Sequence, residues 1–87
     1  MTKLMHVLVV DDEVPLTGVV ASYLQREGYE VTVAHTGPEA VVAARSVLPV
    51  LIVLDVMLPG FDGIEACRQI CHFSDAFIIM LTARADE

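Results

Sequence analysis

Four short apolar runs recur along the chain, each bounded by polar or turn-forming residues. Three of them are almost continuously apolar, which is typical of strands buried on both faces of a parallel sheet. The other, residues 30–35, alternates apolar and polar positions and favours a half-buried strand near a sheet edge. We therefore expect four strands, at residues 6–10, 30–35, 50–54 and 77–81.

Helical periodicity fills the three intervals between these strands. Pro15 suits the first turn of a helix that Gly28 would end. Thr36 and Glu39 have the spacing of a capping box, which predicts the start of a second helix. A third helix is expected over about residues 64–72, after a loop rich in Pro and Gly. The expected apolar faces are Leu16, Val19, Val20, Tyr23 and Leu24 in the first helix, Ala40, Val41 and Ala44 in the second, and Ile64, Cys67, Ile70 and Cys71 in the third.

This alternation of strands and helices predicts an α/β fold in which right-handed crossovers build a parallel sheet. Ligands of such sheets bind beyond the carboxyl ends of the strands, near the point where the strand order reverses. Three carboxylates and one hydroxyl follow the strands at that edge, which we call the rim. They belong to Asp11, Asp12, Asp55 and Thr82, with Ala83 next to the last of these.

The composition narrows the class of protein. A length of 87 residues allows one small domain, and 55% of the residues are hydrophobic although the formal net charge is −7. No apolar run approaches the ~18 residues of a membrane span, and the start of the chain does not resemble a signal peptide. The acidic balance argues against direct binding of nucleic acid. We expect a cytoplasmic domain that does not contact a membrane.

The two cysteines, Cys67 and Cys71, are too few for a disulfide scaffold. Their spacing places both on one helix face, away from the rim. Free cysteines are usually buried, so we expect this pair to be reduced and to pack in the core. Together with His72 they also miss the C-x-x-C-H haem signature by one residue.

The acids at the rim suggest a chemistry. A single Asp at a strand end is usually a helix cap or a turn former. Three packed together would repel one another unless a cation lay between them, and Mg²⁺ prefers such carboxylates together with water and a phosphate. A carboxylate beside magnesium can act as a nucleophile that forms an acyl phosphate. Thr82 would then donate a hydrogen bond to a phosphoryl oxygen, and Ala83 would leave room for an incoming group.

Three stretches carry a family resemblance. Val9-Val10-Asp11-Asp12-Glu13, Leu54-Asp55-Val56-Met57-Leu58-Pro59-Gly60-Phe61-Asp62-Gly63 and Met80-Leu81-Thr82-Ala83-Arg84 closely resemble the receiver domain of two-component response regulators. The resemblance covers residues 1–87 in order, and the stretch that begins at Asp55 is specific. It implies a flavodoxin-like, doubly wound parallel sheet, here truncated after the fourth strand. The ending Leu81–Glu87 looks most like regulators with a winged-helix, DNA-binding output.

The resemblance also implies roles for individual residues. Asp55 would receive a phosphoryl group from a sensor histidine kinase in a phosphorelay, which makes the chain a signalling domain rather than an enzyme. Asp12 and Asp55 would bind Mg²⁺, and Asp11 would contribute directly or through water. The backbone carbonyl of Met57 would complete the metal ligands, and Thr82 would be the switch hydroxyl. Asp62 and Gly63 are expected to start the third helix, the first as a cap and the second through its backbone conformation.

The chain departs from the family at its C-terminal end. Receivers carry a lysine and a switch aromatic on a fifth strand, whereas the only lysine here is Lys3, at the wrong end of the first strand. We expect an incomplete receiver that would contact DNA only through a missing C-terminal domain. Ending after the fourth strand would expose that strand as an edge, so we also expect self-association.

Other functions are considered beside this one. A non-phosphorylated receiver fragment that acts as an interaction module fits the absent lysine. A flavodoxin-like cofactor-binding domain has the same architecture, but it would need a phosphate-binding loop where this chain has Asp11-Asp12-Glu13. An aspartyl phosphatase would typically carry a second acid two residues after the nucleophile, where this chain has Met57.

Overall fold

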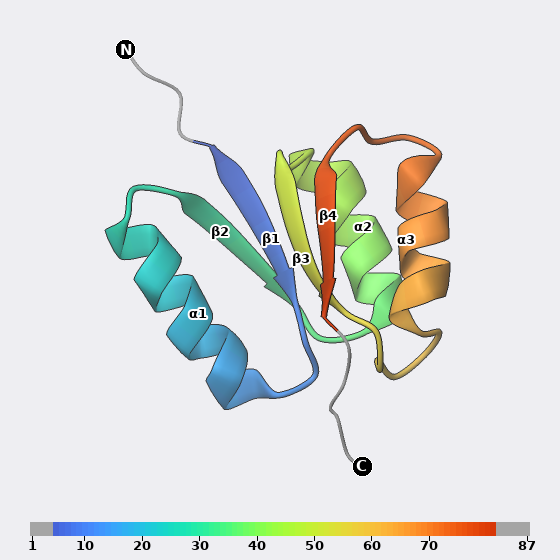
Figure 1. The fold of residues 1–87 in the computed structure, drawn as a ribbon, viewed down its shortest axis with the longest axis horizontal. Coiled ribbons are helices and arrows are strands. Elements are labelled where there is room, and N and C mark those ends of the chain that lie inside the picture. Colours follow the sequence, from blue (N-terminus) through green and yellow to red (C-terminus); the bar gives the residue numbers. More distant parts are fainter. Residues whose placement is uncertain (1–4, 82–87) are drawn as a thin grey trace.

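The computed structural model of the chain describes residues 5–81, in which strands and helices alternate without exception (Figure 1). Each expected element is present, with bounds that differ from the expected ones by three residues at most. The elements are β1 (His6–Val10), α1 (Val14–Arg26), β2 (Glu30–Ala34), α2 (Gly37–Val47), β3 (Leu51–Asp55), α3 (Gly63–Cys71) and β4 (Phe77–Leu81).

The four strands form one parallel sheet in the order β2-β1-β3-β4. The order reverses between β1 and β3, and Val10 pairs with Ala34 on one side and with Leu54 on the other. Helix α1 covers one face over β1 and β2, while α2 and α3 cover the other face (Figure 1). The expected flavodoxin-like, doubly wound arrangement is therefore confirmed for the described strands.

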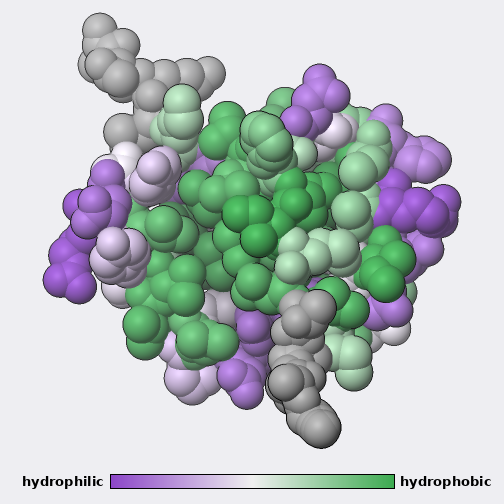
Figure 2. All heavy atoms as spheres, in the orientation of Figure 1, coloured by the Kyte–Doolittle hydropathy of each residue, from purple (hydrophilic) through white to green (hydrophobic). Residues whose placement is uncertain are grey.

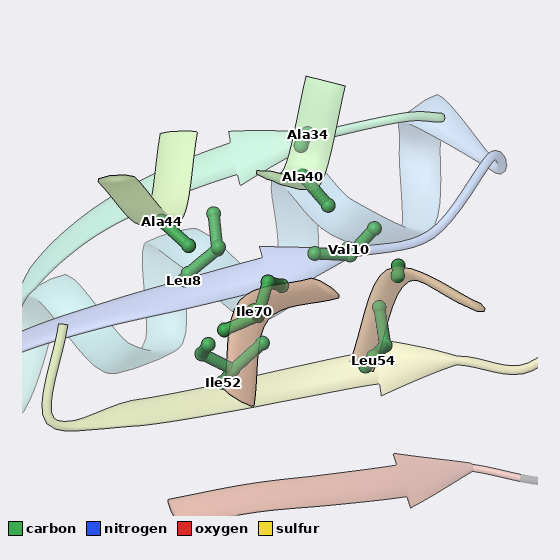
Figure 3. Packing of buried hydrophobic residues seen from close by; sticks show 9 residues of the cluster. Leu8, Val10, Ala34, Ala40, Ala44, Ile52, Leu54 and Ile70 are labelled. Atoms are coloured by element: carbon green, nitrogen blue, oxygen red, sulfur yellow. The ribbon is translucent and has the colours of Figure 1, made fainter. Parts of the chain in front are cut away.

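The main core lies between the sheet and the helix pair α2 and α3 (Figure 3). Most of the large side chains come from the strands, with Ile70 from α3, and most of the small ones are alanines of α2 and α3. Burying each Leu or Ile of this kind contributes about 1.5–3 kcal/mol. The cluster consists of Leu8, Val10, Ala34, Ala40, Ala44, Ile52, Leu54, Ala66 and Ile70.

Helix α2 buries Ala40 and Ala44 as expected, whereas α1 and α3 bury only part of the apolar faces that their periodicity predicts. In α1 the buried residue is Thr17, whose hydroxyl donates to the carbonyl of Val14 at 2.9 Å, while Leu16, Val19 and Tyr23 are exposed. In α3 the buried residues are Gly63, Ala66 and Ile70. The expected burial of Ile64 and Cys71 is wrong, because the helix is rotated so that the side with Gly63, Ala66 and Ile70 faces the core.

Polar side chains start two of the helices as expected. The Thr36 hydroxyl accepts a hydrogen bond from the amide of Glu39 at 3.1 Å, and the Asp62 carboxylate accepts one from the amide of Glu65 at 3.0 Å. The return bond of the capping box is displaced by one residue, because the Glu39 carboxylate accepts from the amide of His35 at 2.7 Å. These caps fix where α2 and α3 begin, close to the rim.

An ion pair on α3 makes the stability of that helix dependent on pH. Hydrogen bonds from Arg68, at 2.6 and 3.0 Å, and from Gln69 lower the pKa of Glu65 from 4.5 to about 2. A carboxyl with a lowered pKa stabilises the folded state above its unfolded pKa, and that stabilisation is lost as the pH falls toward the folded pKa. We expect the melting temperature of the wild type to approach that of Glu65→Gln between pH 4.5 and about 2. Thermal melts of both proteins followed by circular dichroism check this, and a constant difference would contradict it.

None of the helices within residues 5–81 has the length and apolar character needed to cross a membrane.

Candidate functional site

Asp11, Asp12 and Asp55 meet at the rim. The pairing of Val10 with Leu54 brings the ends of β1 and β3 side by side, so the residues that follow them are neighbours. One carboxylate oxygen from each of the three acids lies within 4.8 Å of the other two. Asp11 and Asp55 are half-buried and Asp12 is exposed. The convergence expected from strand topology is therefore present.

Short local hydrogen bonds orient two of these carboxylates. Asp11 Oδ1 accepts from the amide of Glu13 at 2.9 Å, and Asp55 Oδ1 accepts from the amide of Met57 at 3.2 Å. In both cases the Asp side chain closes a turn by accepting a hydrogen bond from the backbone amide two residues ahead. Each bond holds one oxygen of its carboxylate and leaves the second oxygen free of protein hydrogen bonds among the described residues.

The charge of the cluster favours a hard cation. Two unit charges about 4 Å apart repel by ~1 kcal/mol even in water, and three carboxylates make three such pairs. Within residues 5–81, the ion pairs join Glu30 to His6 and Glu65 to Arg68, so no basic side chain there neutralises the rim. Carboxylate oxygens open to solvent are the donors that Mg²⁺ prefers, because it keeps several of its waters. The donor set therefore fits magnesium.

The backbone beyond Asp55 is tightly packed against the start of α3. The Gly63 amide donates to the carbonyl of Val56 at 2.7 Å, and a Cβ at Gly63 would lie 2.3 Å from the carbonyl oxygen of Asp55. Gly63 does not have a positive φ, so the expectation of a special backbone conformation is wrong. Glycine is required here because the two backbones approach too closely for any side chain.

The same loop is attached to the start of α2. The Gly37 amide donates to the carbonyl of Pro59 at 3.1 Å, and a Cβ at Gly37 would lie 2.3 Å from the carbonyl oxygen of Phe61. Gly60 turns the loop with φ 88°, in the left-handed region that favours glycine. The loop that carries Met57 is thus held from a second side.

Two neighbours of the site were not expected from the sequence. His35 Nδ1 lies 3.0 Å from the backbone carbonyl oxygen of Asp11, and Glu39 binds the His35 amide. His35 directly follows β2, the strand next to β1. Its position just after the end of a predicted strand is the feature of the sequence that could have placed it at the rim. These contacts connect the rim to the start of α2.

The fourth strand ends at the same rim. Leu81 pairs with Asp55, and the Leu81 carbonyl accepts a hydrogen bond from the amide of Val56 at 3.1 Å. Thr82 and Ala83, expected at the phosphoryl site, lie outside the described residues. Met57 is described, and its side chain is exposed.

The sequence matches known proteins over almost its whole length. The family model for the response regulator receiver domain matches residues 7–87. Transcriptional regulatory protein ResD of Bacillus subtilis (strain 168) is 46% identical over 81 residues, which cover 93% of this chain and 34% of ResD. The chain therefore spans about a third of the length of this curated relative.

Solved structures agree with the sequence match. The response regulator TrrA of Thermotoga maritima, in complex with Mg²⁺ and BeF, is 38% identical with a TM-score of 0.84, over 94% of this chain and 72% of that one. A response regulator of Burkholderia pseudomallei with a phosphorylated aspartic acid is 32% identical with a TM-score of 0.86, over 94% of this chain and 49% of that one. Fold, rim and sequence thus agree, and the chain belongs to the receiver domains of two-component response regulators.

Proposed function

We propose that this receiver domain accepts a phosphoryl group at Asp55, from a sensor histidine kinase, in a reaction that depends on Mg²⁺. The observation that carries the proposal is the meeting of three carboxylates within 4.8 Å at the ends of β1 and β3. The Burkholderia relative with a phosphorylated aspartic acid and the TrrA complex with Mg²⁺ support it.

Asp11, Asp12, Asp55 and the backbone carbonyl of Met57 would hold the cation. When bound, magnesium offsets the negative charge that gathers on the phosphoryl oxygens. The fit rests on the donor set, since all four groups offer oxygen and the three carboxylates lack a basic partner among residues 5–81. The turn closed by the Met57 amide fixes Asp55 in place before the reaction.

The chemical step belongs to the Asp55 carboxylate. Its free oxygen attacks phosphorus in line, an O–P bond forms, and the bond from phosphorus to the donor nitrogen or oxygen breaks with its electron pair leaving on the donor. The hydroxyl of Thr82 would donate a hydrogen bond to a phosphoryl oxygen, and the small Ala83 would leave space beside it. Beyond this phosphotransfer to itself and the later hydrolysis of the acyl phosphate, we assign the domain no enzymatic activity.

The output of the switch would lie in a longer protein. ResD is a transcriptional regulatory protein and is about three times as long as the matched segment. We infer a cytoplasmic transcription regulator in which this segment is the receiver and DNA is bound by another domain. The net charge of −7 supports that division, because an acidic receiver would not itself bind a polyanion.

We also propose that the 87-residue chain self-associates through β4. Among the described strands β4 forms one edge of the sheet. Its side chains Phe77, Ile79 and Leu81 are exposed on the same face that α1 covers, but α1 covers that face only over β1 and β2. Figure 2 shows a continuous apolar surface over the strands on this face. An exposed apolar edge strand is a template for pairing with a second copy. The same surface favours the alternative function, an interaction module that works without phosphorylation.

Phosphorylation with a small-molecule donor tests the proposed function. We expect incubation with acetyl phosphate and Mg²⁺ to add one phosphate per chain, and we expect Asp55→Asn or an excess of EDTA to reduce the labelled fraction at least tenfold. The measurement is the intact mass. Asp75→Asn is the matched control, because Asp75 is an exposed acid on the loop before β4. This variant should take up as much phosphate as the wild type.

Two results would contradict the proposal. Label that persists in Asp55→Asn would show that another residue is the acceptor. A wild type that takes up no label under conditions that phosphorylate a complete receiver would favour the interaction module.

A further inference from the structure

A pair of thiols on α3 lies outside the site described above. Cys67 and Cys71 are both free, and their Sγ atoms are 4.0 Å apart. The Cys67 side chain is half-buried against the core, while Cys71 is exposed. The expectation that both cysteines serve as core packing therefore fails for Cys71, which buries little apolar surface.

This pair does not belong to the rim. Helix α3 begins at Gly63, beside the backbone of Asp55, and ends at Cys71. Eight residues at 1.5 Å each place its last residue about 12 Å along the helix from its first. Cys67 therefore lies midway along α3 and Cys71 at its far end, and neither belongs to the group of acids that meets at the rim.

The distance between the sulfur atoms matches a shared metal ion. Two Zn–S bonds of about 2.3 Å that meet at a tetrahedral angle place their sulfur atoms about 3.8 Å apart. The observed 4.0 Å needs an adjustment of only a few tenths of an ångström. Rotation about the exposed Cys71 side chain can supply it without moving the helix.

A disulfide fits the same pair poorly. Residues four apart on a helix have Cβ atoms about 5–6 Å apart, whereas a disulfide holds them at about 3.5–4.5 Å. Oxidation would therefore distort the last turn of α3. Joining the sulfur atoms through a metal ion leaves the helix intact.

We propose that Cys67 and Cys71 form a two-thiolate site for a soft, thiophilic cation of the Zn²⁺ class. Thiolate sulfur is the ligand type that selects such ions over magnesium. Each thiol loses its proton to the solvent as its Zn–S bond forms, and all but two of the waters of the hydrated ion leave as it becomes tetrahedral. Water occupies the other two positions, because no third His, Cys, Asp or Glu joins the pair in the described part of the chain.

The Cys67 thiol keeps its proton before the ion binds. Burial and the hydrogen bond with Cys71 raise the pKa of the Cys67 thiol. Binding near neutral pH therefore releases the Cys67 proton, which gives the site a readout separate from any phosphorylation of Asp55.

Cobalt and zinc titrations of the reduced 87-residue chain test the proposal. We expect Co²⁺ to produce the intense near-ultraviolet band of sulfur-to-cobalt charge transfer, and Zn²⁺ to abolish it at one equivalent. Competition with a coloured chelator gives the zinc dissociation constant. We expect Cys71→Ser to weaken binding at least tenfold, because even the loss of an outer partner of a metal ligand costs about 10–100-fold.

The controls separate this site from the rim and from misfolding. Asp55→Asn should leave the charge-transfer band unchanged, since carboxylates produce none. Cys71 is exposed, so Cys71→Ser should keep the circular dichroism spectrum of the wild type, and Cys67→Ser provides a second removal of a ligand. Unchanged zinc affinity in Cys71→Ser, or a wild type without the band, would overturn the proposal.

Discussion

Replacing Gly63 with alanine is expected to destabilise the fold by at least about 3 kcal/mol, the upper range for overpacking in a rigid site. The added Cβ would lie 2.3 Å from the carbonyl oxygen of Asp55 and 2.8 Å from the Cα of Val56. Both atoms are backbone, so no side chain can rotate away to relieve the clash. Either the end of β3 or the start of α3 has to move. Urea denaturation of the wild type and of Gly63→Ala measures the difference in the free energy of unfolding.

Gly18→Ala is the matched control for this prediction. Gly18 lies inside α1, and a Cβ there would have no heavy atom within 4 Å. Alanine is the better helix former, so this substitution should stabilise the chain by up to about 1 kcal/mol. The two glycine-to-alanine changes therefore have opposite expected signs. Similar unfolding free energies for both variants would show that the close approach at Gly63 does not constrain the fold.

Replacing Ile79 with lysine is expected to convert a self-associated chain into a monomer. Ile79 is 50% exposed in the middle of β4, between Phe77 at 81% and Leu81 at 46%. A charge at this position would have to be buried against the partner strand, and lysine is the residue that commonly protects natural edge strands. We expect the wild type to scatter light as a dimer or larger species at high micromolar concentration. The variant should have the mass of one chain, 9.5 kDa.

Val42→Lys separates this effect from a general gain in solubility. Val42 is 68% exposed on α2, the helix that covers the other face of the sheet, and it receives the same change of charge. Its mass in solution should equal that of the wild type. A monomeric wild type, or equal dissociation by both lysine variants, would contradict association through β4.

The strands and the acids of the rim could be predicted from the sequence. The local pattern of apolar residues determines the strands, and the parallel topology determines which strand ends lie side by side. A continuous apolar run such as 7–10 has to be buried on both faces, and parallel pairing then brings Asp11 next to Asp55. Thr36 and Asp62 cap their helices by accepting hydrogen bonds from the amides of residues three positions ahead, and this spacing can be read directly from the sequence.

The orientation of the helices could not be predicted in the same way. Periodicity shows which residues share a helix face, but the distance between helix and sheet decides which face packs. In α3 the side that packs against the core and α2 buries Ala66 and leaves Ile64 exposed. The contact of Gly63 with Asp55 depends on two backbones that meet only in the folded state, and no local pattern contains it.

The contact between Gly37 and the loop after Asp55 has a mechanical consequence. The Gly37 amide holds the Pro59 carbonyl, and the aromatic ring and carbonyl of Phe61 fill the space where a side chain at Gly37 would be. The loop cannot rise from the rim without breaking that bond or carrying the first turn of α2 with it. A displacement of the loop after Asp55 is therefore coupled to the position of α2 through a contact at Gly37, a residue that has no side chain.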